Sequence, residues 1–551
     1  MSGGWVRLAA AFLVLAVPVA GEDFDKAFKV YQVWVKRPSL HKRTLARERL
    51  ARTGDPRALH QLIQDYARPE EPKDQVRYLI AYMAAETLQD EQFFPIFDEW
   101  RAKADKAPDA WLWYQALRNR VTAGGAAEAM AVAKSDRNVF LRAAAIEALR
   151  FEAEQDLLPF VREIAAKLPS DAFPRAVLLE SLTALLCSRL EQVKTQPFAD
   201  AAADVLARMD EPATLDRTRL AMGRQFAKLF KTRFVWRDGA RWRQELEFLA
   251  RGGMQAKDDR YAKPPTFAGI ETTGDRICYV IDLSDSMLEP LTPLEMERLP
   301  KGPVTGRPQQ KAAESDRWQQ ALEAVKWDKV KNKFDAAREM LKTSLLMLDE
   351  KKSFCVICFG DGAGPLKGTK GIQKATLDNI QAVIKILDGI HPGPPKNGRP
   401  HGTLLGDTNI HGGLHRAFKV KSGTLVGPGE YVNPSTFDDG CDTIFLLSDG
   451  APTCDDWPSP DSRDTEDLTV GRDPETGQRL SDSKGTAIFQ GPYQEAHHVI
   501  GDVARLNLFR KVEIHCVGMG GTTMNILETI AVLGKGQALD LTGGPANAQK
   551  K

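Results

Sequence analysis

A spaced pattern of charged and apolar residues recurs through the first half of the chain. In its clearest form an Arg is followed by Glu five positions later and by Leu seven positions later, starting at Arg43, Arg142 and Arg175. Weaker copies start at Arg77 and Ala110, so successive starts lie 34, 33, 32 and 33 residues apart. A fixed period of this length is typical of stacked helix pairs.

The second helix of such a pair is visible in the apolar spacing between two copies of the pattern. One helix face would carry Leu157, Phe160, Val161, Ile164 and Leu168. A single pair cannot bury its apolar face alone, so neighbouring pairs must stack. Residues 22–250 therefore predict an α-solenoid that resembles HEAT-type repeats, although the period is short for that family. An ordinary irregular helical bundle remains the alternative.

The pattern changes after residues 251–275, where pairs of Gly and Pro among charged residues indicate a linker. Short apolar runs now alternate with helical segments through residues 276–541. This alternation predicts a mostly parallel, doubly wound α/β sheet of the Rossmann-like kind. The expected strands are 276–281, 354–359, 443–447, 512–517 and 537–541, and the expected helices are 327–348, 377–387, 410–418, 493–508 and 524–532.

The first twenty residues are typical of a signal peptide. Arg7 precedes an apolar run from Leu8 to Ala20, which ends among small residues and is short for a membrane-spanning helix. We expect cleavage after about residue 20 and export to the periplasm or the cell exterior, without stable membrane insertion afterwards. An uncleaved signal anchor is the alternative. Residues 542–551 form a C-terminal tail.

Composition narrows the function classes. The 551 residues carry a formal net charge of +1, which gives no support to a protein that mainly recognises nucleic-acid phosphates. Seven cysteines are too few for a disulfide scaffold in a chain of this length. Cys355 and Cys358 fall within an expected strand, so their spacing does not indicate a redox motif.

Residues with oxygen-bearing side chains follow the expected strands. Asp282, Ser284 and Ser286 alternate by two directly after the first strand, Thr408 precedes a short helix, and Asp449 follows the third strand. Ligands of open parallel sheets bind outside the carboxyl ends of the strands. Carboxylates and hydroxyls suit a hard divalent cation, which neutral hydroxyls leave partly unscreened and able to attract an anionic ligand.

These motifs resemble a von Willebrand factor type A (VWA) domain. The resemblance rests on Asp-x-Ser-x-Ser at 282–286, Thr-Asn-Ile-x-x-Gly-Leu at 408–414 and Leu-Leu-Ser-Asp-Gly at 446–450. It implies a metal-ion-dependent adhesion site with Asp282, Ser284, Ser286, Thr408 and Asp449 around Mg²⁺, with Mn²⁺ and Ca²⁺ as alternatives. It also implies a protein partner that donates a carboxylate to the ion.

Other features could modify this site. Asp285 stands where the family commonly has Gly, and the inserts at 288–326 and 452–487 are long for the family. Asp285, Asp407 and His411 are candidates for the rim of the site. The second insert is acidic, which indicates a solvated loop more readily than a second cation site.

We therefore expect an exported, non-enzymatic protein of interaction or adhesion type, with the helical repeat as scaffold. Three other readings stay open. The same cation could serve a metal-dependent phosphatase or esterase, although Ser284 replaces the acid of haloacid-dehalogenase-type phosphatases. The metal could only make the loops rigid. Finally, His411 and His415 have the spacing of two zinc ligands but lack the Glu of the usual motif.

Overall fold

The computed structural model places two compact units, which divide between residues 108 and 109. The predicted signal peptide, Asp407, the predicted C-terminal tail and nearly all of the insert at 452–487 lie outside the described residues. Those described are 23–37, 40–70, 73–88, 91–103, 110–250, 265–300, 321–360, 362–366, 369, 371–392, 408–425, 434–450, 452–453, 496–519 and 524–541.

The first unit consists of helices in its described part. These are α1 (Phe24–Trp34), α2 (Leu40–Ala51), α3 (Pro56–Ala67), α4 (Lys73–Thr87) and α5 (Phe94–Lys103). The Asp55 side chain accepts the backbone N–H of Arg57 at 2.8 Å and caps α3, whose first residue is Pro56. Proline has no N–H to lose at this position, so the sequence Asp-Pro starts the helix cleanly.

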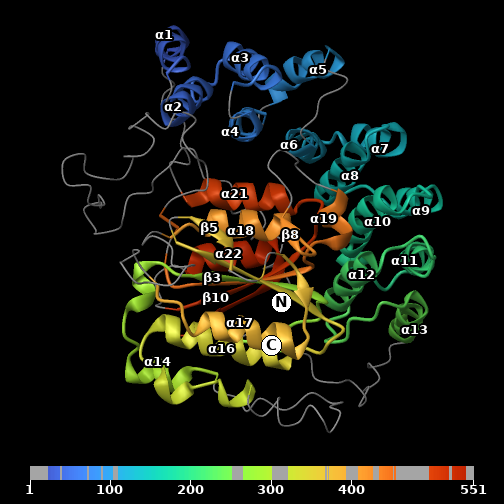
Figure 1. Ribbon diagram of the computed structural model, residues 1–551. Helices are drawn as coiled ribbons and strands as arrows, with labels where there is room; N and C mark the ends of the chain where they lie inside the picture. Colours follow the sequence, from blue (N-terminus) through green and yellow to red (C-terminus); the bar gives the residue numbers. More distant parts are fainter. Residues whose placement is uncertain are drawn as a thin grey trace. The chain divides into compact units, whose positions relative to one another are not determined.

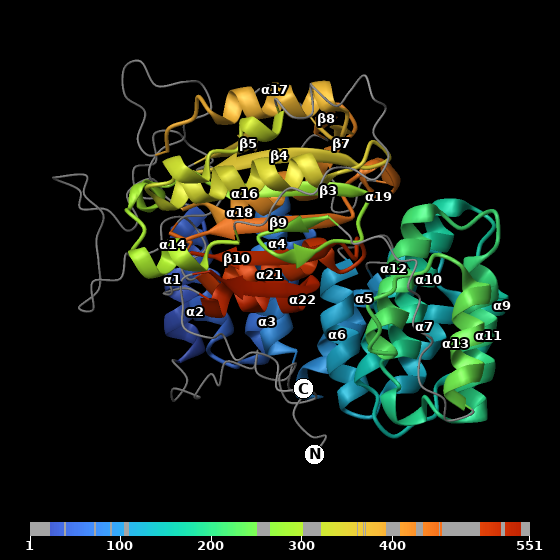
Figure 2. The ribbon, with the colours of Figure 1, turned by 90° about the horizontal axis from the view of Figure 1, so that it is seen from below.

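The second unit begins with eight helices in two layers. They are α6 (Ala110–Thr122), α7 (Ala126–Ser135), α8 (Val139–Ala148), α9 (Leu158–Ala166), α10 (Ala172–Cys187), α11 (Gln196–Met209), α12 (Asp216–Leu229) and α13 (Gly239–Ala250). Helix α8 packs between α6 and α10, and α10 packs on α12. Helices α7, α9, α11 and α13 form the outer layer (Figure 1 and Figure 2). The five predicted pattern starts fall in α2, α4, α6, α8 and α10. The helical region of paired helices is thus confirmed.

A mostly parallel sheet follows, as the sequence predicts. Its parallel strands are β3 (Arg276–Asp282), β4 (Ser353–Phe359), β9 (Thr443–Ser448), β10 (Glu513–Gly518) and β11 (Lys535–Asp540). The order is β11-β10-β9-β3-β4-β5. The short strands β5 (Ala363–Pro365) and β6 (Gln373–Lys374) pair with β4 in the antiparallel direction and were not predicted.

Helices cover both faces of the sheet (Figure 1). Side chains alternate along β3, so Ile277 and Tyr279 pack towards one face while Cys278 and Val280 pack towards the other. On the first face lie α16 (Lys333–Met347) and α17 (Leu377–Leu387), and on the second lie α18 (Ile410–Lys419), α21 (Ala496–Asn507) and α22 (Met524–Leu533).

The start of α16 differs from the prediction. Apolar spacing predicts a helix from residue 327, but the helix begins at Lys333, after a 3₁₀ turn at Trp327–Lys329. The Asn332 side chain accepts the backbone N–H of Asp335 at 2.8 Å and fixes this start. This start places Lys333 at the first position of the helix.

The cysteines do not form disulfides in the part of the chain that the structure describes. Cys278, Cys355, Cys358 and Cys516 lie in strands of the sheet and are buried free thiols. Burial raises the pKa of Cys358 to about 12. These side chains act as small apolar residues of the core, as their positions in expected strands predict.

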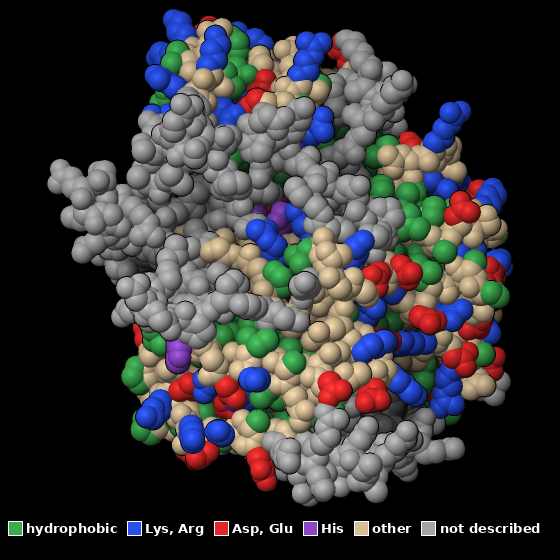
Figure 3. All heavy atoms as spheres, viewed as in Figure 1, with side chains coloured by type: hydrophobic (Ala, Val, Ile, Leu, Met, Phe, Trp, Pro, Cys, Tyr) green, Lys and Arg blue, Asp and Glu red, His purple; other side chains and the backbone are tan. Residues whose placement is uncertain are grey.

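The surface carries charges of both signs. Figure 3 shows Lys and Arg side chains intermixed with Asp and Glu side chains over the helices of the second unit at the right of the view. This mixture agrees with the net charge of +1. None of the described helices has the length and hydropathy needed to cross a membrane.

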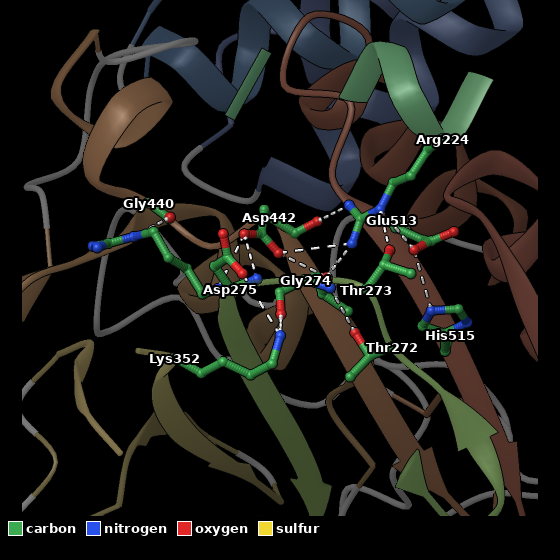
Figure 4. Close-up of polar contacts among 12 residues, drawn as sticks. Arg224, Thr272, Thr273, Gly274, Asp275, Lys352, Gly440, Asp442, Glu513 and His515 are labelled. Carbon is green, nitrogen blue, oxygen red and sulfur yellow. Dashed lines mark hydrogen bonds and ion pairs between the residues drawn. The ribbon is translucent and has the colours of Figure 1, made fainter. Parts of the chain in front are cut away.

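The inner helices of the second unit dock against the amino ends of the strands. Arg224 of α12 donates to the carbonyl oxygen of Asp442 at 2.8 Å and to Thr443 Oγ1 at 2.7 Å, at the start of β9 (Figure 4). Its Nε lies 3.1 Å from Glu513 Oε2, at the start of β10. Asp442 in turn accepts the backbone N–H groups of Asp275 and Arg276 at 3.0 Å, which ties β3 to the same contact.

Further contacts extend this interface along the inner layer. Glu147 of α8 is buried and accepts a hydrogen bond from Lys511, which precedes β10. Phe173 of α10 meets Phe437 of α19 (Pro434–Asp439) edge to face, with ring centroids 5.3 Å apart. Helices α6 to α13 and the sheet therefore share one compact unit, and the docked edge lies at the opposite end of the strands from Asp282.

Candidate functional site

The candidate site lies where neighbouring strands β3 and β9 end. Asp282 is the last residue of β3 and Ser448 the last of β9, and the two strands run in parallel with Ile281 paired to Leu447. The chain continues from β3 to β4 on one side, while β9 pairs with β3 on the other. This reversal of strand order is the place where open parallel sheets bind ligands.

The loop after β3 folds onto its own carboxylate. The backbone N–H of Ser284 donates to Asp282 Oδ1 at 2.8 Å, and the Ser448 hydroxyl donates to Asp282 Oδ2 at 2.6 Å. The hydroxyl oxygens of Ser284 and Ser286 lie 3.1 Å apart. Ser286 donates to Asp449 Oδ1 at 2.7 Å. One hydrogen-bonded network thus joins the first and third motifs, which are more than 160 residues apart in sequence.

Thr408 brings the second motif to the same place. A Cβ atom at Gly450 would lie 3.6 Å from Thr408 Oγ1 and 4.0 Å from Ser286 Oγ, so both hydroxyls lie close to Gly450. This loop is held by a hydrogen bond that the Thr408 N–H donates to Thr453 Oγ1 at 2.9 Å. Hydrogen bonds therefore join Asp282, Ser284, Ser286 and Asp449, and Thr408 lies beside this cluster.

The two carboxylates are buried close to each other. Burial, together with the charge of Asp449, raises the pKa of Asp282 to about 7, although hydrogen bonds from Ser448 and Ser284 oppose the shift. A positive charge at this place would favour the ionised form of Asp282. The chemistry of the donor set, two carboxylates and three hydroxyls, fits a hard divalent cation.

One cation of the protein itself already contacts the cluster. Lys333 Nζ donates to Asp449 Oδ2 at 2.8 Å and to Glu289 Oε2 at 2.6 Å. Burial would lower the pKa of Lys333, but the hydrogen bonds to Asp449 and Glu289 raise it above its ordinary value. Lys333 therefore stays charged and neutralises part of the site.

The candidate rim residues differ in their positions. Asp285 is exposed in the 3₁₀ turn Asp285–Leu288, beside the cluster in sequence. His411 is fully buried and points away from solvent, with Nε2 2.7 Å from Asp502 Oδ2 of α21. Arg505 donates to the other Asp502 oxygen at 2.7 Å within α21, and the hydrogen bond between His411 and Asp502 holds α18 against α21.

A zinc site at His411 and His415 would need further ligands, and the described residues do not provide them. The rings of His411 and His415 are stacked with centroids 5.5 Å apart. Over the ranges that the structure describes, no group of three or more His, Cys, Asp and Glu side chains is arranged to hold a metal ion. The candidate cation site therefore depends on its serine and threonine hydroxyls.

Three contributors to the site were not predicted from sequence. Ser448 belongs to the third motif, and its position just before Asp449 is a signal that could have identified it. Lys333 and Glu289 had no such signal, because neither belongs to a motif and Glu289 lies within the insert at 288–326. No protein-family model matches the chain, and no curated protein matches it either.

Proposed function

We propose that residues 276–541 form a VWA domain that binds a divalent cation, Mg²⁺ first, and through it a carboxylate of a protein partner. The ligands would be Asp282, Ser284, Ser286, Thr408 and Asp449. One observation carries this proposal: three motifs far apart in sequence converge on one hydrogen-bonded cluster at the reversal of strand order.

The partner class follows from the charges of the proposed site. A divalent ion would balance Asp282 and Asp449, while the hydroxyl ligands add no charge. An ion with such neutral ligands keeps affinity for an anionic oxygen at an open coordination position. We therefore propose an acidic residue of a protein as the group that completes the coordination, in a binding role without catalysis.

We propose that the helical region is a HEAT-like scaffold. Its support is the period of about 33 residues, which matches one helix pair, and the layered packing of α6 to α13. The docked helices hold the amino ends of β9 and β10, so they leave the carboxyl-end cluster to other contacts. Export to the periplasm or the cell exterior remains part of the proposal, on the pattern of residues 1–20.

Cation binding is tested first with the full chain and Mg²⁺ alone. Isothermal titration should show saturable binding to the wild-type chain, lost in Asp282→Asn. The matched control is Asp349→Asn, an exposed Asp of the same domain whose oxygen accepts the backbone N–H of Lys351. Binding that Asp282→Asn leaves unchanged would contradict the proposed ligands.

Partner capture is tested by cross-linking in whole cells, with and without a chelator. We expect partners that disappear both with chelator and in Asp282→Asn. Partners that are retained under both conditions would refute the metal-dependent role. A melting temperature that depends on Mg²⁺ without any metal-dependent partner would favour the purely structural alternative. Hydrolysis of a phosphate monoester or a carboxylic ester by the Mn²⁺-loaded chain would favour the hydrolase alternative.

A further inference from the structure

The ammonium group of Lys333 lies at the candidate site. This residue is only 7% exposed, and its Nζ donates to Asp449 Oδ2 at 2.8 Å. The Asp449 side chain has no solvent-exposed surface. The second partner of Lys333 is Glu289, whose side chain is 63% exposed. The ammonium group thus connects a buried carboxylate of the candidate site to a carboxylate at the surface.

The backbone fixes Lys333 in this position. It is the first residue of α16, which Asn332 caps. The Lys333 N–H also donates to the carbonyl oxygen of Glu289 at 3.2 Å, and Pro290 forms an isolated β-bridge with Asn332. These contacts hold the end of the loop that follows β3 against the start of α16. Lys333 therefore reaches Asp449 and Glu289 without a rearrangement of the main chain.

A divalent ion and this ammonium group cannot share Asp449 without cost. Both are positive, and both would lie within a few ångströms of the same oxygen atoms, where repulsion is weakly screened. Loss of the contact with Asp449 would not leave the Lys333 ammonium group without an acceptor, because Glu289 already accepts one of its hydrogen bonds. The side chain needs only a rotation to exchange a shared contact for a contact with Glu289 alone.

We propose that Lys333 is an internal competitor for the cation, bound to Asp449 in the metal-free protein and transferred to Glu289 when the ion binds. The inference rests on the proposed cation site. Lys333 is here a positioning residue that sets the affinity of the site, and Glu289 favours the metal-bound state because it receives the displaced ammonium group. A merely structural Lys333 would support the loop, so that its loss would weaken cation binding.

The experiment measures the dissociation constant of Mn²⁺ alone for the full chain, from the electron paramagnetic resonance signal of the free ion. We expect Lys333→Met to bind Mn²⁺ about tenfold more tightly than wild type, which corresponds to about 1.4 kcal/mol. We expect Glu289→Gln to bind more weakly by about threefold, because Lys333 then has only Asp449. In the double variant the affinity should return to that of Lys333→Met.

Controls separate charge from folding. Lys329→Met changes an exposed lysine four residues earlier and should leave the affinity unchanged. Lys333→Gln keeps a hydrogen-bond donor without the charge, and it should also bind Mn²⁺ more tightly than wild type. It replaces Lys333→Met as the test if that variant fails to fold.

The outcomes distinguish the two proposals. Equal or weaker binding by folded Lys333→Met and Lys333→Gln, with saturable binding by wild type, would overturn the competitor role alone. No Mn²⁺ binding by wild type or by either variant would overturn the competitor role together with the proposed cation site. Tighter binding by Lys333→Met with no effect of Glu289→Gln would overturn the transfer to Glu289.

Discussion

Arg224 allows a quantitative test of how the helical region is held on the sheet. It is only 7% exposed, and it projects from α12 to the starts of β9 and β10 (Figure 4). The change Arg224→Met keeps a long apolar side chain and removes the guanidinium group. Asp442 and Thr443 then lose hydrogen bonds of 2.8 and 2.7 Å, and Glu513 loses its nearest cation.

The expected magnitude follows from the burial of these groups. Removing one partner of a buried ion pair costs about 3–5 kcal/mol, because the other charge stays buried without compensation. Glu513 would keep only more distant partners, His515 at 3.5 Å and Lys228 at 3.7 Å. Burial would raise the pKa of Glu513, and the charge of Arg224 is the largest effect that lowers it below its usual range. We expect Arg224→Met to reduce the free energy of unfolding by about 3–5 kcal/mol.

Urea unfolding followed by tryptophan fluorescence provides the assay, since Trp236 and Trp242 pack together next to α12 with centroids 4.6 Å apart. A double-mutant cycle with Glu513→Gln should give a coupling free energy of about 1–3 kcal/mol. The control Arg162→Met breaks an exposed pair with Asp204 and should cost less than about 1 kcal/mol. A cost for Arg224→Met no larger than that of the control, with zero coupling, would refute the reasoning.

Two further predictions concern packing and pH. Gly413→Ala should destabilise the protein by about 1–3 kcal/mol in the same unfolding assay, because its Cβ would lie 2.8 Å from Val280 Cγ1; Gly362→Ala, with open space around it, serves as control. Burial would raise the pKa of Glu147, but Lys511 is the main charge that lowers it from 4.5 to about 2. The resulting stability is present above pH 4.5 and is lost as the pH falls towards 2. Glu147→Gln should therefore flatten the decline in unfolding free energy measured across this interval, and an unchanged decline would contradict the assignment.

The sheet was largely predictable because each central strand is buried on both faces. The run Arg276–Asp282 is apolar apart from its two ends, and β4, β9 and β10 show comparable runs, whereas the edge strand β11 is only half-buried. The edge strand β5 consists of Ala, Gly and Pro, which carry no strand signal. Its pairing with β4 comes from tertiary contact, so the pattern of the chain could not reveal it.

The candidate site was predictable only where its residues follow strands directly. Asp282, Ser284 and Ser286 alternate in one loop, and Asp449 comes one residue after β9. Lys333 reaches the cluster from the start of a helix, and that start depends on the cap at Asn332 rather than on apolar spacing. Arg224 was equally hidden, because its partners are defined by how the inner helices dock.

The buried thiols of the sheet also provide an internal probe of its dynamics. Cys278 and Cys355 face each other as Cα partners on β3 and β4, and both are completely buried. Their side chains lie on the face of the sheet that α18 covers, so a thiol reagent can reach them only when this helix lifts from the sheet or the strands separate. The rate at which they are alkylated in native buffer therefore measures how often the core between the sheet and this covering helix opens.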